Sequence, residues 1–164
     1  MIACLDVDYR ESIAYAAGLA FHNWPDAIPA TEKVVPVVGV YPYQPGQFFR
    51  RELPCLLAVV RELPPVAVVI VDGYVWLEGV SVPGLGAHLY HSLAGKVVVI
   101  GVAKTRYAGA RAVEVLRGRS TRPLFITAAG MSSESAAEHV GFMHGPNRIP
   151  TLLKRVDFLC RQAG

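Results

Sequence analysis

The sequence lacks any apolar run long enough to cross a membrane, and it contains few charged residues. Its apolar stretches, among them residues 66–71 and 97–102, are short, whereas a membrane-spanning helix needs about 20 apolar residues. Charged residues make up 18% of the chain and hydrophobic residues 52%, a composition that excludes an intrinsically disordered protein. The sequence therefore predicts a globular protein with no transmembrane segment and no membrane partner.

Cysteine is also scarce. The three cysteines, Cys4, Cys55 and Cys160, are widely spaced, and each lies in an apolar stretch. This pattern favours neither a disulfide framework nor a zinc site, so we interpret the cysteines as small core residues in a reducing compartment. The N-terminus has no basic segment followed by a long apolar run, so we predict no secretory signal and expect a cytoplasmic location.

Short β-branched runs alternate with segments of helical periodicity along the chain. Residues 2–9, 33–41, 66–72, 96–103 and 123–128 are predicted strands, and residues 47–63, 84–94, 132–143 and 150–162 are predicted helices. Residues 12–21 suit either a strand or a short helix. Pro36 places its strand at a sheet edge or a bulge. With 164 residues, the chain is predicted to be a single α/β domain spanning residues 1–164.

Positive charge is concentrated in one segment. The formal net charge is only +3, but six of the 16 lysines and arginines lie between residues 104 and 122, opposed there by Glu114 alone. They are Lys104, Arg106, Arg111, Arg117, Arg119 and Arg122. Such a segment suits contact with a phosphate backbone, and a solvated helix face is an equally good interpretation.

Two aspartates occupy unusual positions in predicted strands. Asp6 interrupts the first apolar strand, and Asp72 ends the strand at residues 66–72, just before Gly73. A carboxylate in such a place is unfavourable unless it is paired or bound to a metal, and the carboxyl ends of strands are where open α/β sheets bind ligands. The alternatives are an Asp-Gly turn at Asp72 and, for Asp6 with Asp8, a pair of acids exposed at a sheet edge.

Two further acids lie on predicted helices. Glu52 lies early in its helix, where a solvated acid near the positive end of the helix dipole is an equally ordinary interpretation. Asp157 lies on the last helix near Lys154 and Arg155, which favours a surface ion pair. Together with Asp6 and Asp72, these acids could form an all-oxygen cluster, which would prefer Mg²⁺ or Mn²⁺ to zinc.

Seven short segments of the chain, taken in order, resemble the endonuclease V family. They are residues 2–9, 42–46 with 49–52, 69–73, 84–89, 100–104, 122–126, and 148–150 with Asp157 downstream. Their order and approximate spacing match over nearly the whole chain. The chain is thus similar to a short and divergent member of this family.

The resemblance implies an RNase H-like fold, in which helices flank a mixed central β-sheet. It also implies a DNA-repair endonuclease that depends on Mg²⁺, or on Mn²⁺, and cleaves DNA or RNA that contains inosine or is otherwise damaged or distorted. Matched by position, Asp6, Glu52, Asp72 and Asp157 correspond to the metal-binding acids. The residues that match the family's catalytic residues are Asp6, Glu52, Asp72 and Lys104. We expect a monomer.

The resemblance also implies residues that contact nucleic acid. Pro42, Tyr43, Gln44 and Pro45 match the family's strand-separating wedge, in which the Tyr43 ring would stack where a base is displaced. The alternative is an aromatic turn residue that packs on the following helix. Arg106, from the basic segment, is a further candidate contact with nucleic acid.

The chain departs from the family pattern at several places, among them a shorter link between Lys104 and Arg122. Residues 74–79 replace a polar segment that contains His and Arg, Met131 stands near the place of another His, and Gln44 replaces the usual Ile of the wedge. These changes leave open a second hypothesis, a nucleic-acid-binding protein with little or no turnover. A third, a module that binds a small phosphorylated ligand near Asp72, lacks the glycine-rich phosphate loop it would need.

Overall fold

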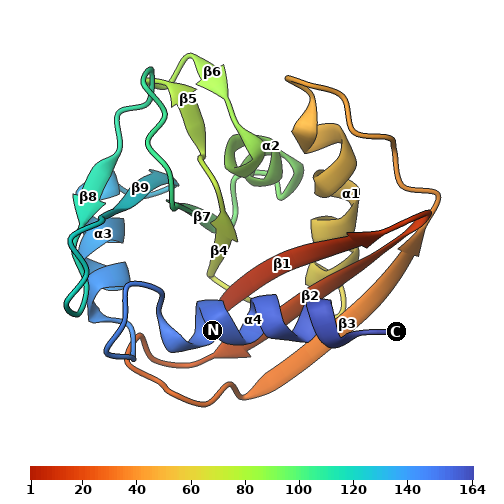
Figure 1. Cartoon of the computed structure of the whole chain (residues 1–164), viewed down its shortest axis with the longest axis horizontal. Helices are drawn as coiled ribbons and strands as arrows, with labels where there is room; N and C mark the ends of the chain where they lie inside the picture. The colour runs from red at the N-terminus through yellow and green to blue at the C-terminus, as the bar shows by residue number, and fades with distance from the viewer.

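The computed structural model describes residues 1–164 as a seven-stranded sheet with helices on both faces (Figure 1). The strands of this sheet are β1 (Ile2–Arg10), β2 (Ile13–Phe21), β3 (Thr31–Val38), β4 (Val68–Asp72), β7 (Val98–Ala103), β8 (Val113–Val115) and β9 (Leu124–Ala129). A separate two-stranded sheet contains β5 (Trp76–Glu78) and β6 (Val82–Pro83). The helices are α1 (Phe48–Val60), α2 (Leu85–Ser92), α3 (Ser133–Phe142) and α4 (Thr151–Gln162). None of these helices has both the length and the apolar character that a bilayer crossing requires.

The main sheet is mixed, as expected from the resemblance. Its strand order is β3-β2-β1-β4-β7-β9-β8, with parallel pairing only between β1 and β4 and between β4 and β7. Residues 12–21, which suit either a strand or a helix by sequence, form β2 in the middle of an antiparallel ladder. Pro36 lies in β3 at the edge of the sheet, where its missing N–H is tolerated.

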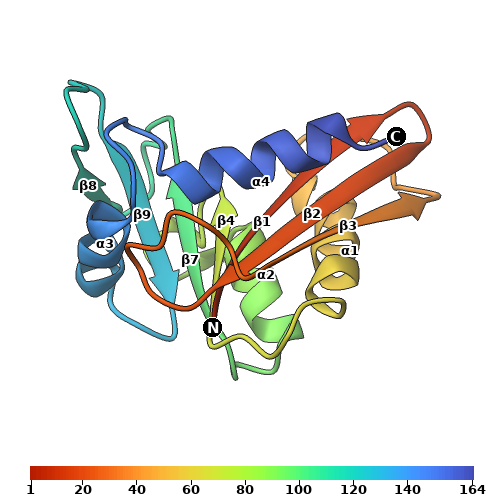
Figure 2. The same cartoon turned by 90° about the horizontal axis from the view of Figure 1, so that it is seen from below.

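Two apolar layers sandwich the sheet. Alternate residues of the strands point to opposite faces, so Cys4 packs with α3 and α4, whereas Leu5 packs with α1 and α2. Figure 2 shows α4 lying across β1 and β2 on one side, with α1 and α2 on the other. Burial on both faces explains why the central strands are almost continuously apolar.

The basic segment at residues 104–122 is not a helix, so its interpretation as a solvated helix face was wrong. It is an irregular loop that contains the short strand β8. Arg117 is buried and donates hydrogen bonds to the carbonyls of Met143, Gly145, Asn147 and Arg148. This arginine therefore fixes the loop that leads into α4 and is not free to contact a phosphate.

Candidate metal centre

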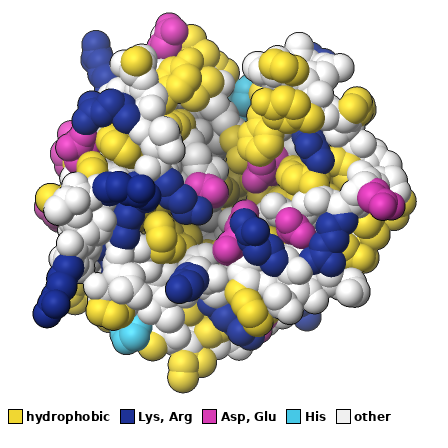
Figure 3. All heavy atoms as spheres, in the orientation of Figure 1, with side chains coloured by type: hydrophobic (Ala, Val, Ile, Leu, Met, Phe, Trp, Pro, Cys, Tyr) yellow, Lys and Arg dark blue, Asp and Glu magenta, His cyan; other side chains and the backbone are white.

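The four acids singled out by sequence converge on one cavity. Asp6 on β1, Asp72 at the end of β4, Glu52 on α1 and Asp157 on α4 line it together with Lys104, which follows β7. The cavity has a volume of about 260 Å³. In Figure 3, acidic side chains gather around a hollow near the centre of this face, with lysines and arginines on both sides.

The divergence of two parallel strands opens this cavity. The ladder between β1 and β4 contains the pairs Ile2 with Val68, Ala3 with Val69 and Cys4 with Ile70, and then ends. Asp6 and Asp72 each lie two residues beyond the last pair, where Figure 1 shows the strands separating. The gap lets a side chain from α1 on one face and one from α4 on the other face reach the same space.

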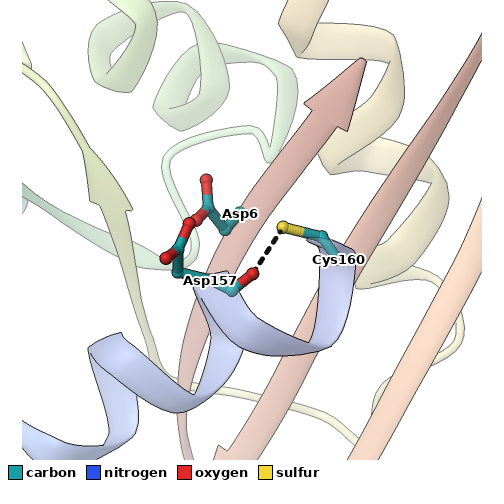
Figure 4. Close-up of side chains that lie close together, drawn as sticks. All are labelled: Asp6, Asp157 and Cys160. Atoms are coloured by element: carbon teal, nitrogen blue, oxygen red, sulfur yellow. Dashed lines mark hydrogen bonds between the residues drawn. The ribbon is translucent and has the colours of Figure 1, made fainter. Parts of the chain in front are cut away.

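A close approach joins β1 to α4 within this site. Oxygens of Asp6 and Asp157 and the Sγ atom of Cys160 all lie within 4.8 Å of one another (Figure 4). Cys160 lies three positions after Asp157 on α4, and this spacing places both side chains on the helix face that packs on β1. Glu52 and Asp72 lie outside this tight group but line the same cavity.

The electrostatics of the cavity disfavour several negative charges without a cation. Burial raises the pKa of Asp6 to about 7, aided by the charges of Asp72 and Asp157 and opposed by a hydrogen bond from the Val7 N–H. Burial also raises the pKa of Glu52 to about 8, and the charges of Asp6 and Asp72 add to the effect. A bound divalent cation would relieve this repulsion.

Positive side chains offset only part of this charge. The Lys104 Nζ lies 3.6 Å from a carboxylate oxygen of Asp72, and both side chains are half exposed. The Arg161 Nε lies 2.7 Å from Asp157 Oδ1. The surface ion pair expected at Asp157 therefore exists, with Arg161 in place of Lys154 or Arg155, and it coexists with the approach of Asp157 to Asp6.

The structure also decides between the alternatives at the other acids. Glu52 is only 6% exposed, so the interpretation of a solvated acid near a helix start was wrong. The backbone bends after Asp72, where Gly73 adopts a positive φ of 102°, and the Asp72 side chain lines the cavity. Asp8 forms an ion pair with Arg10 at 2.9 Å.

The candidate nucleic-acid contacts lie outside the cavity. Tyr43 is 60% exposed in the segment before α1, and its ring meets Phe48 edge-on at 6.4 Å. Pro42 and Gln44 line a neighbouring groove, and Pro45 lies between Gln44 and the start of α1. Tyr43 therefore contacts α1, the helix that it precedes, as the alternative interpretation of an aromatic turn residue predicted. Most of its ring is still presented to solvent.

Arg106 is exposed but already paired. Its guanidinium forms an ion pair with Glu114 and lies 5.3 Å from the centre of the Phe125 ring. Within the basic segment, Lys104 is the residue that lines the acidic cavity. Arg106 could contact nucleic acid only by sharing or giving up the Glu114 carboxylate.

The segment at residues 74–79 is fixed to the sheet. The Val75 N–H donates to the Thr127 hydroxyl at 2.8 Å, and the Trp76 indole N–H donates to the Ala128 carbonyl at 3.3 Å. The segment crosses β7 at Gly101, where a Cβ would lie 2.5 Å from the Gly73 carbonyl oxygen. Glycine is therefore required at residue 101 for the backbone that follows Asp72 to take this path.

Sequence reasoning missed the position of Cys160. It identified the residue correctly as buried, but it gave no reason to expect its Sγ beside two carboxylates. The spacing of three residues from Asp157 was the available signal, because such residues share a helix face. Only the packing of α4 on β1 turns that spacing into a contact.

Comparison with known proteins decides the family. The family model described as Endonuclease V matches residues 1–140. The chain belongs to the endonuclease V family. An Endonuclease V from Streptomyces avermitilis is 32% identical to it over 148 residues, which cover 75% of this chain and 62% of the relative. For the Streptomyces coelicolor Endonuclease V, the identity is 31%, over 75% of this chain and 61% of the relative. The chain thus spans about three fifths of the length of these relatives.

Solved endonuclease V structures share the fold. The Streptomyces avermitilis enzyme superposes with a TM-score of 0.78 at 25% identity, over 98% of this chain and 79% of the other. The catalytic domain of human Endonuclease V gives the same score and identity, over 98% of this chain and 80% of the other. Ciona intestinalis Endonuclease V, solved with DNA that contains an inosine followed by a ribo-adenosine, has a TM-score of 0.78 at 18% identity, over 98% of this chain and 83% of the other. The RNase H-like fold expected from the sequence is confirmed.

Proposed function

We propose that this protein is a divalent-metal-dependent endonuclease that hydrolyses phosphodiester bonds in inosine-containing or otherwise distorted nucleic acid. The observation that carries the proposal is the convergence of Asp6, Glu52, Asp72 and Asp157 with Lys104 on one cavity. Family membership over residues 1–140 supports the same chemistry. The proposed ion is Mg²⁺, with Mn²⁺ as an alternative, because the four acids offer hard oxygen ligands.

The residues present fit such an ion. The Glu52 carboxylate is buried, faces the cavity and has no hydrogen-bond partner. A buried carboxylate in this state is unfavourable unless a cation compensates it. Asp6, Glu52, Asp72 and Asp157 would hold the ion. When bound, it would activate water and neutralise charge on the phosphate and the leaving oxygen.

Other side chains have roles that do not depend on the ion. Lys104 would stabilise negative charge on the phosphate, since its ammonium lies at the cavity mouth beside Asp72. Arg161 would orient the Asp157 carboxylate through the 2.7 Å ion pair. Both side chains are at least half exposed, so substrate can reach them.

The exposed segment before α1 would contact the substrate. Tyr43, flanked by Pro42 and Pro45, presents a rigid aromatic ring on which a base can stack. Gln44 offers an amide beside it, and Arg106 would add a phosphate contact at the rim. DNA is the proposed substrate, with RNA as an alternative. We further propose that the protein acts as a monomer in the cytoplasm.

A cleavage assay with a matched pair of variants tests this function. The substrate is a labelled oligonucleotide duplex with a single inosine, incubated with protein in EDTA, in Mg²⁺ or in Mn²⁺. We expect nicking that needs the cation and falls more than about 1000-fold in Asp72→Asn, because a ligand that stabilises the transition state is lost. Glu138→Gln, an exposed acid on α3 outside the cavity, should nick like the wild type.

A second candidate function remains because the chain departs from the family near the site. Residues 74–79 and Met131 lack the histidines and arginine that the family pattern leads one to expect. A protein that binds inosine-containing nucleic acid with salt-sensitive affinity, but nicks none of the DNA or RNA substrates in either cation, would establish the non-catalytic alternative. Robust nicking would exclude it.

A further inference from the structure

Cys160 brings a sulfur ligand to the edge of the acidic cavity. Its Sγ atom and oxygens of Asp6 and Asp157 lie within 4.8 Å of one another, and all three residues line the same cavity (Figure 4). Cys4 and Cys55 are also free and buried, but neither lines this cavity. Of the three thiols, Cys160 alone has this environment.

The backbone holds the three ligands from two elements. Asp157 and Cys160 are three residues apart on α4, and α4 packs directly on β1, which carries Asp6. Cys160 is 1% exposed, so its sulfur is reached from the cavity rather than from bulk solvent. Side chains fixed in this way need little reorganisation to surround one ion.

We propose that Asp6, Asp157 and Cys160 form a binding site for a thiophilic divalent cation of the Zn²⁺ and Cd²⁺ class. Two carboxylates and one thiolate supply three protein ligands, and water completes a tetrahedral site. Binding forms the bond from the metal to Sγ, and the thiol proton leaves to solvent, since a coordinating thiol is deprotonated. Sulfur ligation favours Zn²⁺ and Cd²⁺ over Mg²⁺, which prefers oxygen.

Glu52 gives a second observation that points to a cation in this cavity. Its carboxylate is buried and unpartnered, and it faces the same cavity from the opposite side of the sheet. The three residues make few other protein contacts. Asp6 accepts a hydrogen bond from the Val7 N–H at 2.9 Å, and the Cys160 thiol donates one to the Asp157 carbonyl at 3.2 Å. Asp157 also forms an ion pair with Arg161, which is solvent-exposed and worth less than about 1 kcal/mol.

The inferred site overlaps the one proposed for Mg²⁺, because Asp6 and Asp157 belong to both. This overlap rests on the proposed function, and it implies that a thiophilic cation displaces Mg²⁺ and blocks cleavage. The ligation itself can be measured without any nuclease assay. A protein that binds Cd²⁺ through sulfur but never nicks nucleic acid would refute the proposed function and leave this inference intact.

Titration of the full chain with Cd²⁺ tests the site directly. Bonding of sulfur to Cd²⁺ produces a charge-transfer absorbance in the ultraviolet, which we expect to saturate at about one Cd²⁺ per protein. The band should be absent in Cys160→Ser and unchanged in Cys55→Ala, a matched buried thiol. Asp157→Asn should weaken binding by at least about tenfold, because even loss of a residue that only supports a ligand has an effect of this size.

Excess Mg²⁺ should raise the apparent dissociation constant for Cd²⁺ if the two sites share Asp6 and Asp157.

The inference is overturned if wild-type protein shows no charge-transfer band. It is equally overturned if the band persists in Cys160→Ser, or if Asp157→Asn binds Cd²⁺ as tightly as the wild type. Circular dichroism shows whether Cys160→Ser folds. If it does not, Asp157→Asn still tests the site, because this variant retains the thiol and lacks only one carboxylate.

Discussion

The acidic cavity and the segment before α1 differ in how firmly the fold holds them. Glu52 is 6% exposed and reaches the cavity from a helix packed on the sheet, whereas Tyr43 is 60% exposed on an irregular segment. Asp6 lies within a nine-residue strand paired along its whole length with β2. The aromatic contact of Tyr43 is a single edge-on meeting with Phe48.

This difference separates two kinds of function. Acids that project from regular elements keep a fixed geometry at the expense of electrostatic repulsion, which suits a site that holds an ion. An exposed aromatic residue on a loop contributes little to the fold and can adapt to a substrate. The effects of substitution should therefore differ in kind as well as in size.

The largest effect should come from removing a buried charge. Glu52→Gln keeps the size of the side chain but loses a proposed ligand, so we expect cleavage to fall by more than about 1000-fold, equivalent to about 4 kcal/mol. The melting temperature in EDTA at pH 8 should not fall, because the variant lacks a buried negative charge near Asp6 and Asp72. Cleavage assays and thermal melts, with Glu138→Gln as the control, check both expectations. If Glu52→Gln lowers the melting temperature but keeps full cleavage activity, Glu52 is a structural residue and not a metal ligand.

An intermediate effect is expected at Arg117, which belongs to the basic segment but is buried, like Glu52. Arg117→Met leaves the carbonyls of Met143, Gly145, Asn147 and Arg148 without their donor. We expect the free energy of unfolding in urea to fall by about 3 kcal/mol. The exposed neighbour Arg119, changed to Met, should alter it by less than about 0.5 kcal/mol. Equal effects of the two substitutions would show that Arg117 has no special structural role.

The smallest effect should come from the exposed segment. Tyr43→Ala should weaken binding of inosine-containing DNA by about 1 to 2 kcal/mol, because one stacking ring is lost, and should leave the melting temperature unchanged. Tyr43→Phe keeps the ring and should bind like the wild type. Fluorescence anisotropy at fixed salt measures the affinities. If Tyr43→Ala lowers stability and leaves binding intact, the ring serves only to pack on α1.

Much of the fold could be predicted from sequence because its elements carry strong local patterns. The apolar run of β4 and the helical spacing of α1 and α4 were found close to their observed bounds. The strands β5, β6 and β8 were missed, since they contain only two or three residues each. Such short strands are defined by their partners and leave almost no periodicity to detect.

The sequence by itself determined the family resemblance, the four acids and the buried character of the cysteines. Only the tertiary structure decided that these acids share one cavity, because that depends on where β1 and β4 stop pairing. It also decided that Arg117 is structural and that Cys160 lies beside Asp6. Arg10 and Cys160, which are 150 positions apart and hydrogen-bonded, meet because whole elements pack together. Local sequence patterns do not encode such contacts.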